Sequence, residues 1–322
     1  MNIESNKVID CLLGVAVGDA LGVPFEFKRT FEMIENPATE MTEYGTHHQP
    51  VGTWSDDSSL TFCLAESLAD NYDLADMAKK FINWRDNNYW TANGEVFDIG
   101  ITTNNAISEL EEIVDYKNYE KLKALKNQAS ELDNGNGSLM RILPLLFYIK
   151  KKGIKEQFEI IWEASALTHK HIRAAMSCFI YLKLAEYLLN GEEKELAYTT
   201  MKADVLQLWD DIKFDKLEQQ HFKRIIQNHI LETKREDLKS GGYVIESLEA
   251  SLWCFMNESD YKNALLSVIN LGHDTDTTGA ITGGLAGLYY GISNIPENWI
   301  KVIKRLNDIV ELGNKLNNKC MA

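Results

Sequence analysis

A glycine recurs at every fourth position in the stretch Gly14-Val-Ala-Val-Gly18-Asp-Ala-Leu-Gly22. This spacing places the three glycines on one face of a helix. Each glycine costs about 1 kcal/mol of helix stability relative to alanine, so some contact must offset about 2 to 3 kcal/mol. Residues 278–292 carry a second face of glycine and alanine. We therefore predict two central helices that pack almost backbone to backbone, either for packing alone or also to border a site.

The rest of the chain has the periodicity of helices. Apolar residues recur at three- and four-residue spacing, as in Leu60, Leu64 and Leu68, and alternating β-branched runs are scarce. The 322 residues are 45% hydrophobic and 25% charged, which excludes a disordered or collagenous chain. We predict an all-α, single-domain orthogonal bundle of a dozen or more helices. The more polar region 190–239 is expected to be either a helical lid or a solvated outer layer.

Charge and cysteine usage limit the partners and the compartment. The net charge of −15 argues against nucleic-acid binding. The longest strongly apolar run, 142–149, is interrupted by Pro144 and is far shorter than the roughly 20 residues of a membrane span. The five cysteines are scattered singly without a CxxC pair, and no secretory signal is evident. We expect a cytoplasmic protein with reduced thiols and no membrane partner.

A first acidic stretch, Gly52-Thr-Trp-Ser55-Asp56-Asp57-Ser58, comes directly before a helical pattern. Ser55 or Asp56 alone would suffice as a helix N-cap. The doubled acid favours a site over a cap, because a helix entry can turn two neighbouring carboxylates toward one point.

A second acidic stretch, Gly272-His-Asp274-Thr-Asp276-Thr277, comes directly before the second glycine face. Carboxylates two residues apart converge in a loop, so we expect a loop here. All donors of the two stretches are oxygens, which favours Mg²⁺, Mn²⁺ or Ca²⁺ over zinc. Two carboxylates about 4 Å apart repel by about 4 kcal/mol at an effective dielectric constant of about 20, and divalent cations remove that cost. We predict that the two stretches lie together and hold two cations.

Three further motifs accompany them in order along the chain: Gly14 to Glu26, Phe97-Asp98-Ile-Gly100-Ile-Thr-Thr, and Gly135-Asn136-Gly137-Ser138-Leu-Met-Arg141. Together the motifs resemble the ADP-ribosylglycohydrolase family over nearly the whole chain. The resemblance implies an all-α domain with a binuclear Mg²⁺ or Mn²⁺ centre at the base of a central cleft. It implies these metal ligands: Ser55, Asp56, Asp57, Asp274, Asp276 and Thr277.

The resemblance also implies two catalytic carboxylates, Asp98 and Glu26. Either could be the general base, and Glu26 could instead be a gate beside the metals. From the sequence, Asp98 could instead cap the helix that follows it, and Glu26 could be an exposed acid after a turn at Pro24. Asp19, inside the glycine helix, is expected to hydrogen-bond to the acidic stretches.

Further residues are expected to bind the substrate. The loop at Asn136, Gly137 and Ser138 is predicted to open a helix over about 138–150, where backbone amides suit a diphosphate. His169 resembles a histidine that lies near the substrate in the family, although it could be purely structural. Tyr243 could stack on adenine or be a core residue. Gly100 lies in the turn after Asp98.

The function implied is release of ADP-ribose from a modified protein side chain, with ADP-ribosyl-arginine as the first expectation. Serine-linked ADP-ribose, poly(ADP-ribose) and O-acetyl-ADP-ribose remain alternatives. A binding protein that blocks an ADP-ribosyltransferase and a two-metal phosphoesterase are the competing classes. The expected partner is an ADP-ribosylated protein, the chain is expected to be a monomer, and region 190–239 is expected to vary within the family.

Overall fold

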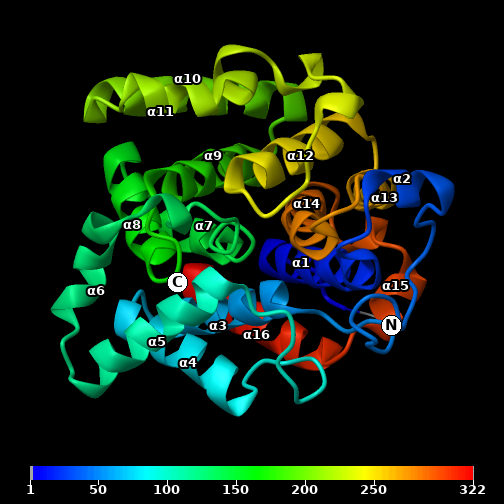
Figure 1. Cartoon of the computed structure of the whole chain (residues 1–322), viewed down its shortest axis with the longest axis horizontal. Helices are drawn as coiled ribbons and strands as arrows, with labels where there is room; N and C mark the ends of the chain where they lie inside the picture. The colour runs from blue at the N-terminus through cyan, green and yellow to red at the C-terminus, as the bar shows by residue number, and fades with distance from the viewer. Residues whose placement is uncertain (1–2, 322) are drawn as a thin grey trace.

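A computed structural model describes residues 3–321, and within them the fold is entirely helical (Figure 1). An isolated bridge between Gly135 and Tyr243 is the sole β-type pairing in this range. The prediction of an all-α fold with a dozen or more helices is confirmed. The α-helices are α1 (Lys7–Gly22), α2 (Thr30–Glu35), α3 (Asp56–Asp70), α4 (Leu74–Asn87), α5 (Ile101–Asp115), α6 (Glu120–Ala124), α7 (Leu146–Ile149), α8 (Ile154–Ala166), α9 (Ile172–Leu189), α10 (Lys194–Ile212), α11 (Lys216–His221), α12 (Val244–Asn257), α13 (Tyr261–Ile269), α14 (Thr275–Tyr290), α15 (Glu297–Val302) and α16 (Leu306–Met321).

Short 3-10 or π turns connect several of these helices. They are η1 (Val23–Phe25), η2 (Leu125–Gln128), η3 (Glu131–Asp133), η4 (Leu143–Leu145), η5 (Lys223–Gln227), η6 (Ile230–Glu232), η7 (Arg235–Asp237) and η8 (Ile292–Asn294).

The antiparallel pair α1 and α14 lies at the centre of the molecule, and its glycines are in backbone contact. A Cβ atom on Gly18 would lie 2.1 Å from the carbonyl oxygen of Gly279, and one on Gly283 would lie 2.2 Å from that of Gly14. No side chain fits at these distances. The predicted pair of closely packed central helices is therefore confirmed. The contact also brings the end of α1 beside the start of α14, because a Cβ on Gly22 would lie 2.4 Å from the carbonyl oxygen of Thr275.

Helices α3 and α16 pack on one side of the central pair, and α12 and α13 pack on the other (Figure 1). One hydrophobic cluster runs from Val8 in α1 to Leu316 in α16. Region 190–239 forms α10, α11 and the turns after them, which lie as an outer layer over α9 and α12 (Figure 1). This layer is packed rather than loose, because Tyr198 and Phe222 are fully buried. Its variability within a family stays a prediction.

One helical segment, Lys7–Phe25, is long and apolar enough to span a membrane by length and composition, with a mean hydropathy of 1.8. The expectation that no segment reaches this length is wrong for these 19 residues. All of the apolar window is buried within the fold, as in the core helix of a folded domain.

Two predicted helix boundaries differ from the structure. Residues 138–141 form turns, and helical structure begins only at η4 and α7. The reason is Pro144, which lacks an N–H group and clashes with the carbonyl of the residue four positions earlier, so a helix that began at 138 could not continue through it. The second acidic stretch is not wholly a loop, because α14 begins at Thr275 with Asp274 as its N-cap and Asp276 in its first turn.

Candidate active site

The site lies where α1 ends and where α3 and α14 begin, and Asp19 of α1 holds the start of α3. Its Oδ1 accepts a hydrogen bond from the backbone N–H of Ser55 at 2.9 Å. Its Oδ2 accepts from the backbone N–H of Ser58 at 2.9 Å and from the Ser58 hydroxyl at 2.6 Å. Asp19 thus satisfies donors that a helix start leaves free, which fixes the direction of the first acidic stretch.

The two acidic stretches meet at this point. The hydroxyls of Ser55 and Thr277 donate to Asp57 Oδ2, at 3.0 Å and 3.4 Å respectively. Carboxylate oxygens of Asp19, Asp57 and Asp276 lie within 4.8 Å of one another. Asp57 Oδ1 and Asp276 Oδ2 are buried and have no hydrogen-bond partner among residues 3–321. The fold therefore concentrates negative charge and leaves two carboxylate oxygens available to a ligand.

Burial and mutual repulsion both favour the neutral form of these acids. Burial raises the pKa of Asp57 well above its usual range, and the charges of Asp19 and Asp274 raise it further. The pKa of Asp276 is raised in the same way by burial and then by Glu26 and Asp57. Burial, Asp57 and then Asp98 raise the pKa of Asp56. A proton or a cation must therefore neutralise the cluster.

Glu26 extends the cluster toward the surface. It follows η1, its side chain is only 5% exposed, and its carboxylate is in contact with His47 Nε2. The sequence-level alternative of an exposed acid is therefore wrong. Ligand atoms of Glu26, His47, Asp98 and Asp276 lie within 4.8 Å of one another. Burial raises the pKa of Glu26 to about 7, and the contact with Glu26 raises the pKa of His47.

Asp98 lies in the loop before α5 and does not cap that helix, because Gly100 is the N-cap. Its backbone has a φ of 52°, in the left-handed region that few non-glycine residues adopt. The side chain is half-buried, and its carboxylate makes no hydrogen bond within the part of the chain that the structure describes. Asp98 therefore faces the cluster with its oxygens free.

The loop at 134–138 is tied to the start of α14. Asn136 Nδ2 donates to Asp274 Oδ2 at 2.7 Å and to the Ser247 hydroxyl at 2.8 Å. The backbone N–H of Asn136 donates to the carbonyl of Gly242 at 3.0 Å, and that of Asp274 donates to the carbonyl of Ser240 at 2.9 Å. Asn136 therefore orients Asp274, which is half-buried and whose pKa is raised chiefly by desolvation.

The other residues expected to bind the substrate differ in how far their side chains are buried. Ser138 is fully buried, and its hydroxyl accepts from Ser165 at 2.8 Å, so its side chain is not free to reach a ligand. His169 is buried directly under the loop, where a Cβ on Gly137 would lie 2.5 Å from its ring, and burial lowers its pKa to about 3. Tyr243 is half-buried, with its hydroxyl 3.3 Å from His221 Nδ1.

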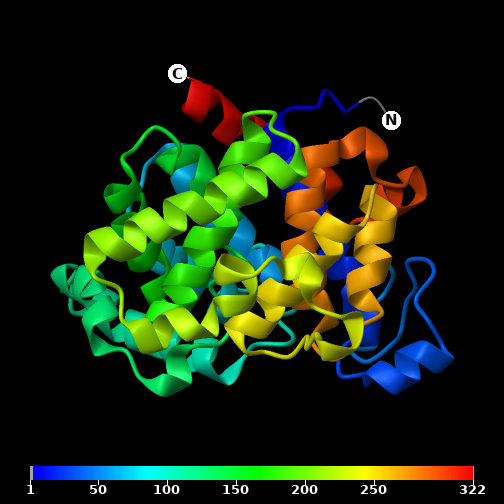
Figure 2. The same cartoon turned by 90° about the horizontal axis from the view of Figure 1, so that it is seen from above.

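Gly100 is exposed, and the nearest atom to an added Cβ would be Thr103 Oγ1 at 3.8 Å. The site thus lies at one end of the α1 and α14 pair. Figure 2 shows α2 at this end, far from the N-terminus. His47 was not anticipated, because it lies in a loop and belongs to no motif.

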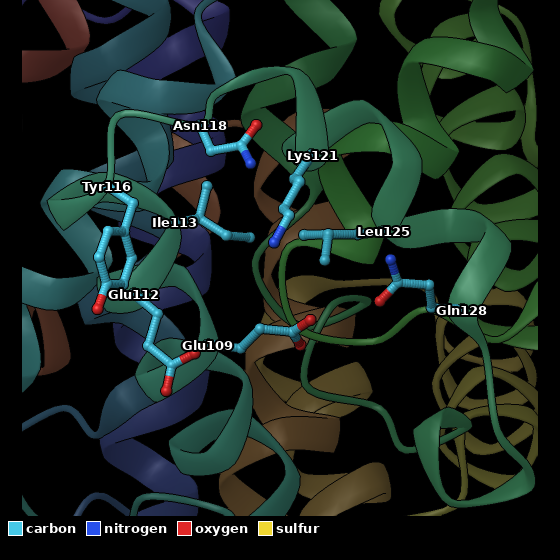
Figure 3. Close-up of a pocket in the computed structure, with 8 residues that line it drawn as sticks. All are labelled: Glu109, Glu112, Ile113, Tyr116, Asn118, Lys121, Leu125 and Gln128. Carbon is cyan, nitrogen blue, oxygen red and sulfur yellow. The ribbon is translucent and has the colours of Figure 1, made fainter.

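A separate pocket of about 460 Å³ lies between α5 and α6 (Figure 3). Its lining includes Glu109, Tyr116 and Lys121, and none of the acidic cluster contributes to it. It is not part of this site.

The acidic cluster is suited to a hard divalent cation. Its donors are carboxylate and hydroxyl oxygens, and two buried carboxylate oxygens have no other partner among the described residues. The chain therefore has a group of acidic residues that could hold a metal ion.

A family model described as ADP-ribosylglycohydrolase matches residues 2–322. The chain belongs to the ADP-ribosylglycohydrolase family. It is therefore a hydrolase of a glycosidic linkage of ADP-ribose, and the family expected from its motifs is confirmed.

Named relatives and a solved structure agree with this family. The ADP-ribosylarginine hydrolase Tri1 of Serratia proteamaculans (strain 568) is 30% identical over 319 residues, which cover 97% of this chain and 79% of that protein. An ADP-ribosyl-dinitrogen reductase glycohydrolase of Rhodospirillum rubrum is 25% identical over 306 residues, 92% of this chain and 89% of that protein. A solved structure described as an ADP-ribosylglycohydrolase-related protein complex superposes with a TM-score of 0.78 at 27% identity, covering 98% of both chains.

Proposed function

We propose that this ADP-ribosylglycohydrolase cleaves the bond between ADP-ribose and an arginine side chain of a modified protein. The observation that carries the proposal is the meeting of Asp57 and Asp276, each with a free buried oxygen, beside Glu26 and Asp98. The arginine linkage is supported by two relatives named ADP-ribosylarginine hydrolase, at 30% and 29% identity.

Two divalent cations, Mg²⁺ or Mn²⁺, would be held by oxygens of the two acidic stretches. When bound, they would coordinate the hydroxyls of the ribose and stabilise negative charge there. The proposed ligands are Ser55, Asp56, Asp57, Asp274, Asp276 and Thr277.

Asp98 is the proposed general base. A base must be free to accept a proton from water, and the carboxylate of Asp98 has no hydrogen-bond partner among residues 3–321, whereas that of Glu26 is engaged by His47. As Asp98 takes the proton, the water oxygen forms a bond to the anomeric carbon. The bond from that carbon to the arginine nitrogen breaks, and the guanidine leaves with the electron pair. It takes up the proton that Asp98 has accepted, so Asp98 is ionised again.

The loop at 134–138 is the proposed binding site of the diphosphate. The backbone N–H groups of Gly137 and Ser138 have no acceptor among the described residues. Gly137 must be a glycine for the loop to lie on His169, as its close contact shows. Two neighbouring free amides form a small anion site, which suits a diphosphate. Tyr243, which pairs with Gly135 of this loop, is the proposed contact of the adenosine portion.

The protein is further proposed to act in the cytoplasm. All five cysteines are free thiols, which is typical of a reducing compartment.

The test is incubation with a protein ADP-ribosylated on arginine, with Mg²⁺ or Mn²⁺ and with chelator. Free ADP-ribose should appear only with metal, and Asp98→Asn should abolish its release while leaving the fold intact. Release from serine-linked ADP-ribose but not from the arginine linkage would correct the substrate. Formation of AMP and ribose phosphate would indicate a phosphoesterase, and blockade of an ADP-ribosyltransferase that survives Asp274→Ala with Asp276→Ala would indicate a binding protein.

A further inference from the structure

The loop that carries His47 is fixed directly on the turn that carries Glu26. The backbone N–H of Thr46 donates to the carbonyl of Pro24 at 3.1 Å, and the Thr46 hydroxyl donates to the carbonyl of Glu26 at 2.6 Å. A Cβ on Gly45 would lie 1.9 Å from the carbonyl oxygen of Pro24, so this position has no room for a side chain. The loop therefore delivers His47 to one fixed place.

At that place the imidazole of His47 contacts three groups. Its Nε2 is in contact with the carboxylate of Glu26, and its ring packs against Phe97 and Phe27, with centroids 5.3 Å and 5.9 Å away. The His47 side chain is only 14% exposed. Phe27 follows Glu26 in the chain and Phe97 precedes Asp98, so one ring contacts both loops that present the candidate catalytic acids.

The backbone of Asp98 depends on packing by the residues around it. Its left-handed backbone is unfavourable for a residue with a side chain and persists only when the surroundings hold it. Its carboxylate makes no hydrogen bond among the described residues, so packing of the neighbouring side chains holds the loop. Val96 and Ile99 pack against the hydrophobic core, and Phe97 packs toward the site. The ring on which Phe97 packs is His47.

We propose that His47 is a positioning residue for the reaction: it orients Glu26 by direct contact, and it orients Asp98 through the packing of Phe97. The inference rests on the proposed function, because it concerns the geometry of the two acids that would act there. It assigns His47 no proton transfer and no metal. A displacement of about 1 Å in a reacting group can lower a rate about 100-fold. Loss of the His47 contacts should therefore lower kcat.

The first variants are His47→Ala, His47→Gln and, as a matched control, His48→Asn. His48 is the adjacent exposed histidine, and asparagine tolerates its positive φ. With ADP-ribosyl-arginine as substrate, His47→Ala should lower kcat by about 10- to 100-fold with KM within about 3-fold. Because glutamine can still donate to Glu26, His47→Gln should recover part of that loss. His48→Asn should resemble the wild type.

A further variant, Phe97→Leu, separates the two links. It removes the packing toward Asp98 and leaves the contact between His47 and Glu26, and it should lower kcat by about 10-fold. Mn²⁺ affinity, measured by electron paramagnetic resonance, should stay close to that of wild type in both His47 variants and in Phe97→Leu, because neither residue is a proposed metal ligand. Thermal melting of each variant checks the fold, and if His47→Ala does not fold, His47→Gln and Phe97→Leu carry the test.

Three results would overturn the inference. They are wild-type kcat in both His47→Ala and Phe97→Leu, a change confined to KM, or a loss of Mn²⁺ affinity that accounts for the loss of kcat. An inactive wild-type protein on every ADP-ribose linkage would overturn the proposed function itself, and the inference with it. An active wild type with unaffected variants would overturn the inference alone.

Discussion

Asp57 and Asp276 come from opposite parts of the chain, and their carboxylate oxygens lie within 4.8 Å of one another in a group with Asp19. Two charged carboxylates at about 4 Å repel by about 4 kcal/mol at an effective dielectric constant of about 20. The carboxylates are held together because the glycine contacts place the start of α14 beside the end of α1, and Asp19 of α1 holds the start of α3. Because Asp57 and Asp276 are held together despite their repulsion, a bound cation would stabilise the site.

Replacing one of these acids should separate stability from metal binding. Asp57→Asn removes a charge from the cluster without changing its shape, so the metal-free melting temperature should rise or stay the same. The same variant should lose most of its affinity for Mn²⁺, by about 10- to 100-fold or more, because a carboxylate ligand is gone. Differential scanning calorimetry and Mn²⁺ titration measure the two effects.

The matched control for this variant is Asp70→Asn. Asp70 is the last residue of the same helix, its side chain is 65% exposed, and its partner is Lys315. Asp70→Asn should leave Mn²⁺ affinity unchanged. Equal Mn²⁺ affinities of Asp57→Asn and wild type would contradict the assignment of Asp57.

The glycine contacts of the central pair should be intolerant of a single methyl group. Gly18→Ala places a Cβ 2.1 Å from the carbonyl oxygen of Gly279, so α1 and α14 must move apart. We expect a loss of about 3 kcal/mol or more in the free energy of unfolding, as for an overpacked core. Gly153→Ala is the control, since its Cβ would meet nothing within 4 Å. Urea unfolding of the two variants with equal midpoints would contradict this account of the core.

Much of this site could be predicted from the sequence because the signals were local. The spacing of Gly14, Gly18 and Gly22 shows a close helix contact without any knowledge of the partner helix. Each acidic stretch directly precedes a pattern of helix residues, so its place at a helix start could be predicted too. The meeting of the two acidic stretches could be predicted because both precede helices expected at the centre of the fold.

The features that were missed depend on contacts between distant segments. His47 has no motif of its own, and its importance comes from Phe97, which is fifty positions later in the chain. The one available signal was an aromatic residue next to each candidate acid, Phe27 beside Glu26 and Phe97 beside Asp98. The helix predicted from residue 138 is wrong for a local reason, because Pro144 cannot lie in the interior of such a helix.

The metal-free protein should be less stable at pH 7.5 than at pH 5. The pKa of Asp19 is raised from 3.8 to about 6 and that of Glu26 from 4.5 to about 7, chiefly by burial. The folded state therefore binds these protons more tightly than the unfolded state. The stability gained is fully present below about pH 4 and is lost as the pH rises to about 6 for Asp19 and about 7 for Glu26. The part lost above about pH 5 is about 1.4 kcal/mol for Asp19. Urea unfolding in chelator at several pH values measures the effect.

Cations should reverse this pH dependence. Since a bound cation replaces the protons, the gain in melting temperature on addition of Mn²⁺ should be larger at pH 7.5 than at pH 5. A metal-free protein whose stability rises steadily from pH 5 to 7.5 would contradict the raised pKa values.

Asp19 should matter for the start of α3 rather than for the reaction itself. In Asp19→Asn, the new Nδ2 cannot accept the bonds now made to one of the carboxylate oxygens. We expect a loss of about 2 to 4 kcal/mol in the free energy of unfolding, because buried donors of Ser55 or Ser58 lose their acceptor. Slow amide exchange at the start of α3 should be lost first. Unchanged exchange there would show that Asp19 does not hold this helix.

The most direct test of the central claim is anomalous diffraction from crystals soaked with Mn²⁺ and ADP-ribose. Two manganese peaks should appear between residues 55–57 and 274–277, with the ribose hydroxyls on the side that faces Asp98. A clear map of ordered Asp57 and Asp276 side chains with no manganese between them would contradict the account.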